Sequence, residues 1–518
     1  MRATKSSRRS PTSKPADGPA WWEYAAVAGL LLIIGVLAAM WSHAHGYPLY
    51  YGDAESHLDT ARRIVDSRTP GYDQIGSPWL PLPHVLMLPF VGNMEMWRSG
   101  MAGTIPGVAC FVLAGSFLFG IARLLLGSFA AGIAAALLFG LNPNVLYLQT
   151  TPMSEPVYLA MISGVAFFAV RGNALAAAVF SCGASMTRYE AWALIPVIVV
   201  VLLFTRGFRS ALVFSAIASL PPLYWLAHNW WYYGNALEFY NGPYSAKAIY
   251  QRAVEANMQR YPGDHDWPRA LQYYRAAAEL CAGPTLIWLG SFGLLVAIAR
   301  RAGWALAILT VPAAFFVFSM YSSGTPIYVP HLWPNTYYNT RYGIAALPLL
   351  AFSGAAIVSL IPDRWHGSAV GAVLALAIVP WAMHPGAESW ITWKESEVNS
   401  VARRAWTAES AEFLKENYHK GDGIFFSFGD LTGVLREAGI PLRESLYDGN
   451  NPHFAAAIAR PDLFLWEEWA LAISGDQVAT TLLKLGRAGV RYQCVKIVQV
   501  KDAPAIEIYR RIRPIPAQ

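Results

Sequence analysis

The sequence has few charged residues and few cysteines. Asp, Glu, Lys and Arg together make up 14% of its 518 residues, whereas hydrophobic residues make up 55%. Soluble domains usually contain about 25% charged residues, so this composition argues against a soluble enzyme and favours a membrane protein. The four cysteines show no spacing typical of disulfides or zinc sites. The sequence also has no internal repeat and no glycine-rich phosphate loop.

The net charge of +6 does not indicate a nucleic-acid partner. The basic residues are scattered through short stretches between apolar runs and through the first part of the chain. A nucleic-acid-binding surface would instead gather them in a stripe or patch. We therefore interpret these charges as topology signals, and we predict that residues 1–22 form a disordered, basic cytoplasmic tail.

An uncharged run from Tyr24 to Trp41 follows this tail. The apolar region of a cleavable signal peptide is shorter, and many further apolar runs follow this one. The sequence therefore favours an uncleaved signal anchor over a cleaved signal peptide.

Apolar windows predict a polytopic α-helical membrane protein with about 11 transmembrane helices. The helices are expected near residues 24–42, 99–120, 125–147, 156–170, 173–187, 190–205, 210–228, 282–299, 303–320, 342–361 and 367–384. With a cytoplasmic N-terminus, every short inner loop is basic, as the positive-inside rule requires. The arginines of these loops are Arg123, Arg171, Arg206, Arg209, Arg300, Arg301 and Arg364. We predict a multi-pass protein of a bacterial inner or plasma membrane, with its C-terminal part outside the cytoplasm.

The predicted transmembrane domain, residues 23–384, has large outward loops at about 43–98, 229–281 and 321–341. Loops of such length are usually functional. Their many aromatic residues are also typical of the aromatic belt at membrane interfaces. From residue 385 to 518, charges become dense and helix-like and strand-like patterns alternate, which predicts an extracytoplasmic α/β domain. Its helices are expected near 407–418, 430–438 and 476–486, and its strands near 424–428, 490–498 and 505–512.

The most informative polar stretch follows the first span and contains Asp53, Glu55, His57 and Asp59. If this stretch is helical, Asp53 and His57 share a face, and Glu55 and Asp59 lie on it less closely. The alternative is a solvated amphipathic helix on the membrane surface.

Further candidate residues lie at the outward ends of apolar spans. Glu155 is a candidate substrate-binding acid, and its alternative is to favour the start of the next helix by its charge. Arg188 and Arg341 could hold a phosphate through paired N–H donors. The alternatives are a salt bridge with Glu190 for Arg188 and snorkelling to the headgroups for either arginine. Lys247 in a long loop is a weaker candidate.

Two residues complete the predicted site, and one further histidine is left out of it. His57 and Tyr189, which follows Arg188, are added as candidate substrate-binding residues. No metal site is predicted: His265 lies between two aspartates, and this arrangement is more typical of a solvated turn than of metal ligands.

The order of first span, outward loop opening on Asp53, and juxtamembrane Ala61-Arg62 resembles the GT-C glycosyltransferases that use polyprenyl-phosphate sugars. The resemblance is closest to the branch of protein O-mannosyltransferases and aminoarabinose transferases of lipid A. In that branch the loop begins Asp-Glu and is followed by Ala-Arg. Here Asp53 matches the Asp, but Ala54 stands where Glu is expected, and the second acid is displaced to Glu55.

The resemblance implies a GT-C-like fold and an inverting sugar transfer. The donor would be a hexose or pentose carried on an undecaprenyl- or decaprenyl-type phosphate. The acceptor would be an extracytoplasmic glycan, lipid or protein, and the lipid bilayer would be a further partner. Asp53 would be the general base, with Glu55 as a second catalytic candidate. Because the phosphate leaving group needs little protonation, one base can suffice, unlike in glycoside hydrolysis.

Two questions stay open at this level. A divalent cation is possible, because oligosaccharyltransferases of the superfamily need one, whereas the mannosyltransferase branch generally does not. The alternative functions are a transporter or flippase for lipid-linked glycans and a non-catalytic envelope protein. A transporter would place charges near the middle of the bilayer and often show two matching halves.

Overall fold

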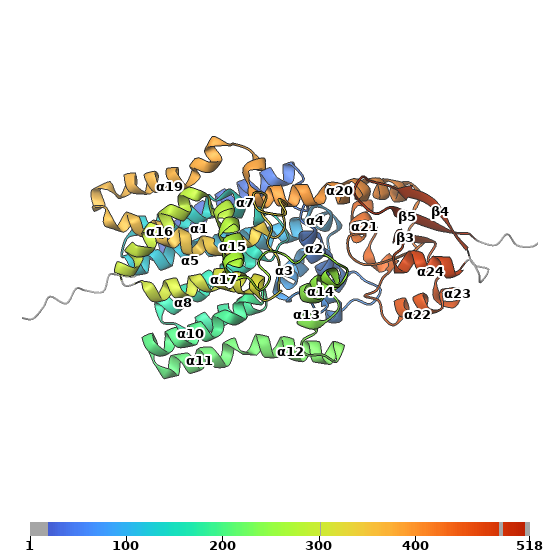
Figure 1. Ribbon diagram of the computed structural model, residues 1–518, viewed down its shortest axis with the longest axis horizontal. Helices are drawn as coiled ribbons and strands as arrows, with labels where there is room; N and C mark the ends of the chain where they lie inside the picture. Colours follow the sequence, from blue (N-terminus) through green and yellow to red (C-terminus); the bar gives the residue numbers. More distant parts are fainter. Residues whose placement is uncertain (1–18, 301, 486–490, 513–518) are drawn as a thin grey trace, which may run out of the picture.

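The computed structural model describes residues 19–300, 302–485 and 491–512. A bundle of helices runs along the long axis of the molecule, and a small domain with a β-sheet lies at one end of this axis (Figure 1). Most of the expected tail, residues 1–22, lies outside the described residues. Arg301, residue 486 of an expected helix and residue 490 of an expected strand also lie outside them.

Within the described residues, six helical segments are long and apolar enough to cross a membrane. They are α1 (Trp21–Ala44), α5 (Met101–Leu126), α11 with α12 (Phe208–Ala218, Leu220–Tyr233), α17 (Gly303–Tyr321), η2–α18–η3 (Thr340–Ala346, Leu347–Ala356, Ile357–Leu360) and η4–α19 (Asp363–Trp365, His366–Met383). A seventh is possible if α15 (Trp267–Ala282) and α16 (Pro284–Ala299), which are bent by 105°, form one broken span. The protein is therefore a multi-pass membrane protein.

The predicted count of about 11 spans is not confirmed. The apolar stretches expected near 156–170, 173–187 and 190–205 form helices of 17, 12 and 17 residues. Those helices are α8 (Glu155–Arg171), α9 (Ala174–Ser185) and α10 (Glu190–Arg206). A helix that crosses the membrane straight needs about 20 residues. Composition alone therefore overestimates the number of spans, because it counts such short apolar helices as full crossings. The stretch near 125–147 is likewise broken into α6 (Phe129–Gly140) and α7 (Pro143–Leu148), because Asn142 caps a new helix.

The long loops are themselves largely helical. The first contains α2 (Gly52–Val65), η1 (Tyr72–Ile75), α3 (Leu82–Val91) and α4 (Met94–Ser99). The region expected as a loop near 229–281 contains the end of α12, then α13 (Glu238–Asn241), α14 (Ala246–Glu255) and α15. Many side chains of α2 and α15 are buried, whereas α13 has no buried residue and α14 has one, Tyr250.

The small C-terminal α/β domain is present, as expected. Its sheet has the strand order β2-β1-β3-β5-β4. The strands are β1 (Ile424–Phe426), β2 (Ser445–Leu446), β3 (Trp469–Ile473), β4 (Arg491–Val498) and β5 (Ile506–Ile512). β1 is parallel to β2 and β3, whereas β5 is antiparallel to β3 and β4. β3 was not expected, because it is buried along nearly its whole length and lacks the alternating pattern of a half-exposed strand.

The helices of this region start before the sheet. α20 (Ile391–Asn417) is 27 residues long, so the helix expected near 407–418 is only its last part. The remaining elements are η5 (Ala387–Ser389), α21 (Thr432–Ala438), η6 (Leu442–Glu444), α22 (His453–Ala459), α23 (Pro461–Phe464) and α24 (Gln477–Leu485).

One hydrophobic core joins the first loop to the C-terminal domain. Leu58 of α2 and Trp97 of α4 belong to the same buried cluster as Trp406 of α20 and Ile424 of β1. A separate, larger core fills the helix bundle. α2 therefore lies between the bundle and the C-terminal domain, with a different neighbour on each side.

Candidate functional site

Asp53 lies in the first turn of α2, and its side chain is 48% exposed. Its carboxylate accepts a hydrogen bond from Nη2 of Arg341. Because Asp53 is separated from Arg341 by 288 residues, only the fold brings them together. This half-exposed acid is the accessible member of a cluster of charged side chains.

Arg341 is the centre of that cluster and is 5% exposed. It lies in η2, two residues after Asn339, which has a positive φ of 55°. Besides Asp53, it pairs through Nε with Oε1 of Glu155 at 3.1 Å and through Nη1 with Oε1 of Glu395 at 2.9 Å. One guanidinium thus holds three carboxylates, which come from α2, α8 and α20.

Arg188 extends the cluster on the other side of Glu155. Its Nη1 is 3.0 Å from Oε1 of Glu155, and its Nη2 is 2.9 Å from Oε1 of Glu190. The salt bridge considered for Arg188 is therefore present, but it is shared with Glu155. The guanidinium of Arg188 also lies 4.8 Å from the ring centre of Tyr342, and the guanidinium of Arg341 lies 5.0 Å from the same ring centre. The two arginines flank one aromatic ring and one carboxylate.

Four carboxylates face two guanidinium groups in this cluster, so the acids outnumber the cations. Three of the acids are almost fully buried, and only Asp53 is open to solvent. In the part of the chain that the structure describes, Oε2 of Glu155 has no hydrogen-bond partner. The cluster therefore has one half-exposed acid at its surface and one buried carboxylate oxygen without a hydrogen-bond partner.

His57 lies one turn after Asp53, as expected, on the same side of α2. Its Nδ1 is 2.9 Å from Nε2 of His84, and its ring packs 4.3 Å from that of Trp79. Burial, followed by the positive charges of Arg188 and Arg341, lowers the pKa of His57 to about 3. His57 is therefore neutral at ordinary pH, and its hydrogen-bond and ring contacts are with His84 and Trp79 and not with the acids of the cluster.

Glu55 and Asp59 lie on the opposite side of α2, which corrects the expectation that they partly share the face of Asp53. Two residues along a helix rotate a side chain by about 200°, so Glu55 points away from Asp53. Glu55 pairs with Arg436 at 2.6 Å and with Arg403 at 2.9 Å, both from the C-terminal part of the chain. Glu55 thus contacts the C-terminal domain, whereas Asp53 faces the bundle.

Asp59 belongs to the same buried group as Glu55. It accepts a hydrogen bond of 2.7 Å from Nε1 of Trp97, and its distance to Nη1 of Arg436 is 3.5 Å. Burial raises the pKa of Asp59 to about 6, and the charge of Glu55 acts in the same direction, while Arg436 opposes it. This group is a joint between α2 and α21.

Arg62, of the Ala-Arg pair that carries the resemblance, is also buried. It pairs with Asp66 at 2.6 Å and donates to the carbonyl oxygens of Val91 and Gly92. Its guanidinium lies 4.8 Å from the ring centre of Trp97. Arg62 therefore ties α2 to the end of α3 and does not contact the Arg341 cluster.

Tyr189 and Lys247 do not belong to the cluster. The hydroxyl of Tyr189 donates to the carbonyl of Pro78 at 3.1 Å and accepts from Nε1 of Trp225 at 3.0 Å. Nζ of Lys247 donates to the hydroxyl of Tyr240 at 2.8 Å. The structure therefore brings together Asp53, Glu155, Arg188 and Arg341 and leaves these two apart.

Glu395 was missed by the sequence reasoning. It follows the last apolar span in a stretch that also contains Lys394 and Glu397, so no local pattern distinguishes it from a solvated helix face. Only its burial and its partners, which lie more than 50 residues away, reveal it. The one usable signal is its position at the start of a helix directly after the last span.

A metal ion does not fit this carboxylate cluster. In residues 19–300, 302–485 and 491–512, no group of three or more His, Cys, Asp or Glu side chains is arranged to hold a metal ion. Asp53, Glu155 and Glu395 each contact the guanidinium of Arg341, which lies where a shared cation would be.

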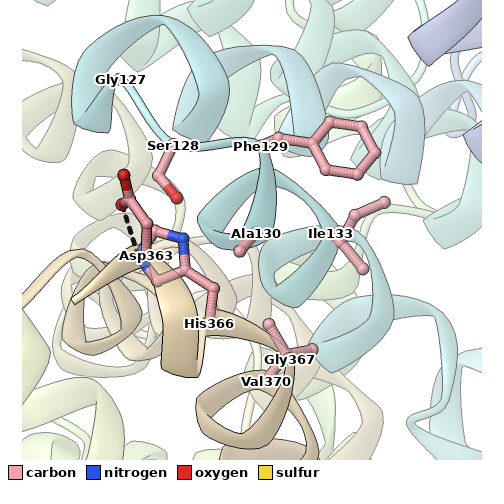
Figure 2. Close-up of a pocket in the computed structure, with 9 residues that line it drawn as sticks. All are labelled: Gly127, Ser128, Phe129, Ala130, Ile133, Asp363, His366, Gly367 and Val370. Atoms are coloured by element: carbon pink, nitrogen blue, oxygen red, sulfur yellow. Dashed lines mark ion pairs between the residues drawn. The ribbon is translucent and has the colours of Figure 1, made fainter. Parts of the chain in front are cut away.

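Two cavities lie away from Asp53. One of about 650 Å³ lies between the residues that follow α1 and helices α20 and α21, and Glu55 and Arg436 are part of its wall. The other, of about 560 Å³, lies between the starts of α6 and α19 and is lined by Asp363, which is exposed, and by His366 at 3.4 Å from it (Figure 2). Neither cavity is lined by Asp53 or Arg341.

Comparison with known proteins gives matches of fold. No protein-family model matches the sequence, and no curated protein matches it. The structure of ArnT from Cupriavidus metallidurans bound to undecaprenyl phosphate matches with a TM-score of 0.54 and 14% identity, over 95% of this chain and 98% of that one. ArnT in the apo state matches with the same TM-score and identity, over 93% and 98%. The apo oligosaccharyltransferase of Archaeoglobus fulgidus matches with a TM-score of 0.47 and 12% identity, over 88% of this chain and 70% of that one.

The likeness to ArnT extends over nearly the whole of both chains. At 14% identity it shows a shared fold and no more. The GT-C-like fold expected from the resemblance is thereby confirmed, with its helical membrane domain and its smaller C-terminal domain.

Proposed function

We propose that the protein is a membrane glycosyltransferase that transfers a sugar from a polyprenyl-phosphate donor to an acceptor outside the cytoplasm. The observation that carries this proposal is the half-exposed carboxylate of Asp53 on the buried guanidinium of Arg341, in a fold shared with ArnT. ArnT has been solved with undecaprenyl phosphate bound, which supports a lipid phosphate of this type as the carrier.

Asp53 acts as the general base in this proposal. It accepts the proton of the acceptor hydroxyl while the hydroxyl oxygen attacks the anomeric carbon of the donor sugar. The bond between that carbon and the phosphate oxygen breaks, the configuration inverts, and the polyprenyl phosphate leaves with the electron pair. A positioned base typically contributes about 10²–10⁴-fold to such a step.

Arg341 and Arg188 supply the positive charge for the departing phosphate. Fixed guanidinium groups in a buried setting stabilise developing negative charge without having to reorganise. Their planar donors also match phosphate oxygens better than a lysine would. The unpaired Oε2 of Glu155 is a further acceptor for a sugar hydroxyl or amine. Under this proposal Glu155, Arg188 and His57 line the substrate site, whereas Glu55, Tyr189 and Lys247 have no direct part in the reaction.

The arginines of the short loops support the proposed side of the membrane. Arg123, Arg171 and Arg206 lie at the ends of α5, α8 and α10, in the last turn of each helix. Asp53 lies near the opposite end of the bundle, since α4 leads directly into the start of α5. By the positive-inside rule, these arginines are cytoplasmic and Asp53 is extracytoplasmic.

The direct test is deletion of the gene, followed by mass spectrometry of envelope glycans, lipids and lipid-linked sugars. The deletion strain should accumulate a polyprenyl-phosphate sugar and lose one glycan or lipid modification. Wild-type protein should reverse both changes, and Asp53→Asn at equal membrane abundance should reverse neither. Restoration by Asp53→Asn would refute the base assignment, and an unchanged set of lipid-linked sugars would refute the proposed reaction.

A further inference from the structure

Glu395 makes an unusually complete set of hydrogen bonds with one short turn. Its Oε1 accepts from the backbone N–H of Asn339 at 3.0 Å and from Nη1 of Arg341 at 2.9 Å. Its Oε2 accepts from the backbone N–H of Arg341 at 3.1 Å and from the hydroxyl of Thr340. The side chain is 2% exposed, so these donors have no access to solvent as a replacement.

The turn needs such a partner. The first N–H groups of a helical segment have no acceptor within the segment, and here they are buried at the start of η2. Asn339 also has a positive φ of 55°, which is uncommon for a residue with a side chain. Glu395 satisfies both backbone donors of this turn and thereby fixes the conformation from which the Arg341 side chain extends.

The three edges of the Arg341 guanidinium are used differently. Nε contacts Glu155 and Nη1 contacts Glu395, and both of these carboxylates are buried. Nη2 contacts Asp53, the only one of the three acids that is open to solvent. An incoming phosphate can therefore reach Arg341 at the edge that Asp53 occupies, and not at the edges held by Glu155 and Glu395.

We propose that Glu395 is a positioning residue of the transfer site: it holds Arg341 from behind so that Nη2 is presented to Asp53 and to the donor phosphate. This inference rests on the proposed function. When the phosphate binds at Nη2, it competes with Asp53 for that donor, and Asp53 is released to accept the acceptor proton. Arg341 does not move with Asp53, because its Nε and Nη1 atoms stay paired with Glu155 and Glu395.

The same helix also holds the chain that leads to Asp53. Nη2 of Arg403, two turns after Glu395 on α20, donates to the carbonyl of Tyr50 at 2.7 Å. The hydroxyl of Tyr51 donates to the carbonyl of Thr392 at 2.7 Å. α20 therefore contacts both the residues just before Asp53 and the turn just before Arg341. The C-terminal region thus contributes to the geometry of the site through α20.

The test compares Glu395→Gln with Glu397→Gln in purified protein reconstituted in nanodiscs. Glu397 is a matched control, because it lies on the same helix, is 26% exposed and pairs with Lys394 at 3.0 Å. Transfer is measured with the donor and the acceptor varied in turn, and binding is measured with undecaprenyl phosphate itself. The melting temperature is recorded in parallel.

In the wild type, four donors face the carboxylate oxygens of Glu395. Glu395→Gln replaces one of these oxygens with an amide N–H₂, which is itself a donor, so the turn and Arg341 lose their alignment. We expect the KM for the donor and the Kd for undecaprenyl phosphate to rise about tenfold or more, with a lower kcat and little change in the KM for the acceptor. Glu395→Asp, which keeps the charge on a shorter side chain, should recover part of the loss. Glu397→Gln should match the wild type.

Thr340→Val provides a second variant that removes only one of the four hydrogen bonds of Glu395 and preserves shape. It should raise the donor KM in the same direction by a smaller factor, and it carries the test if Glu395→Gln does not fold.

The outcomes separate the inference from the proposed function. If the wild type neither transfers sugar nor binds undecaprenyl phosphate, the proposed function fails. If the wild type is active and Glu395→Gln keeps the donor KM of Glu397→Gln, the positioning role is refuted. Equal losses for donor and acceptor would also refute it, because they would indicate a general collapse of the site.

Discussion

Two buried arginines hold carboxylates of the same helix, α2, from opposite sides. Arg341 pairs with Asp53 on the side of the bundle, and Arg436 pairs with Glu55 and Asp59 on the side of the C-terminal domain. Arg436 is 1% exposed, and its partners are buried as well. The ion pairs are chemically alike, so access to one carboxylate distinguishes the two clusters. The side chain of Asp53 is 48% exposed, whereas those of Glu55 and Asp59 are 11% and 3% exposed, and of these two only Glu55 reaches a cavity wall. The Arg436 cluster is therefore the more closed of the two.

The difference also decides what each cluster contributes. A closed ion-pair cluster is weak evidence for stability, because desolvation offsets the attraction between its charges. Breaking it is costly nonetheless, since the remaining charge stays buried without a partner. A half-exposed carboxylate such as Asp53 remains solvated when its partner moves. The Arg436 cluster is therefore suited to join two parts of the protein, whereas the Arg341 cluster is the one to which we assign the proposed reaction.

The largest expected effect distinguishes Asp53 from Asp59. Asp53→Asn removes the proposed base and should lower the rate of transfer about 10³-fold, within the usual contribution of a positioned proton acceptor. Asp59→Asn changes the same atoms on the closed side, so the rate per folded molecule should stay close to that of the wild type. Both rates are measured on monodisperse protein with the same donor and acceptor. Equal losses would remove the functional distinction between the two sides of α2.

The next effect concerns stability. Arg436→Met keeps a side chain of similar length but leaves Asp59 and Glu55 buried without that cation. Loss of one partner from a buried ion pair costs about 3–5 kcal/mol, so the free energy of unfolding should fall by that order. Chemical denaturation and limited proteolysis in detergent measure the change. Arg443→Met is the control, because Arg443 is 62% exposed and its partner Asp66 keeps a second pair with Arg62. A loss no larger than that of the control would show that the cluster is not a joint.

A smaller loss is expected from Trp97→Phe. The substitution removes the N–H that donates to Oδ1 of Asp59 at 2.7 Å and keeps an aromatic ring in the core. A hydrogen bond to a charged group contributes about 1.5–3 kcal/mol, which sets the expected loss of unfolding free energy. Trp225→Phe is a matched control, because its N–H donates to the neutral hydroxyl of Tyr189 at 3.0 Å. If both variants lose the same stability, Asp59 does not depend on Trp97 for its charge.

The open cluster was more predictable from the sequence than the closed one. Asp53, Glu155, Arg188 and Arg341 each lie beside a long apolar run, where a charge stands out. Arg436 and Glu395 lie in the charged C-terminal region, where acids and bases are frequent and no pattern selects one. Arg436 is 381 residues from Glu55, so only the fold reveals their pairing.

The fold was predictable to a similar degree. Apolar length and arginine placement predicted a multi-pass helical protein, and the order of motifs predicted the GT-C-like fold. The number of spans was not predictable, because composition cannot distinguish a full crossing from a 12-residue helix such as α9. The faces of α2 were also misjudged for Glu55 and Asp59, although the helical period alone could have placed them opposite Asp53.

The smallest expected effect is the pH dependence of stability, to which the two sides of α2 contribute with opposite sign. Burial and the nearby arginines lower the pKa of His57 to about 3. As the pH falls from about 6.5 toward 3, the unfolded chain therefore binds a proton at this residue that the folded protein does not, and stability is lost. Burial raises the pKa of Asp59 from 3.8 to about 6. Between these values the folded protein binds the extra proton, and stability is gained as the pH falls.

In the wild type these two slopes, each about 1.4 kcal/mol per pH unit, oppose each other between about pH 6 and 4. Asp59→Asn removes the gain, so the stability of this variant should fall as the pH drops through that range. His57→Gln removes the loss that His57 causes, so the stability of that variant should fall less steeply than that of the wild type, because burial also lowers the pKa of His84 and this residue remains. The unfolding temperature is measured against pH for all three proteins. Parallel curves would mean that neither protonation is coupled to folding, and the two sides of α2 would then differ in exposure alone.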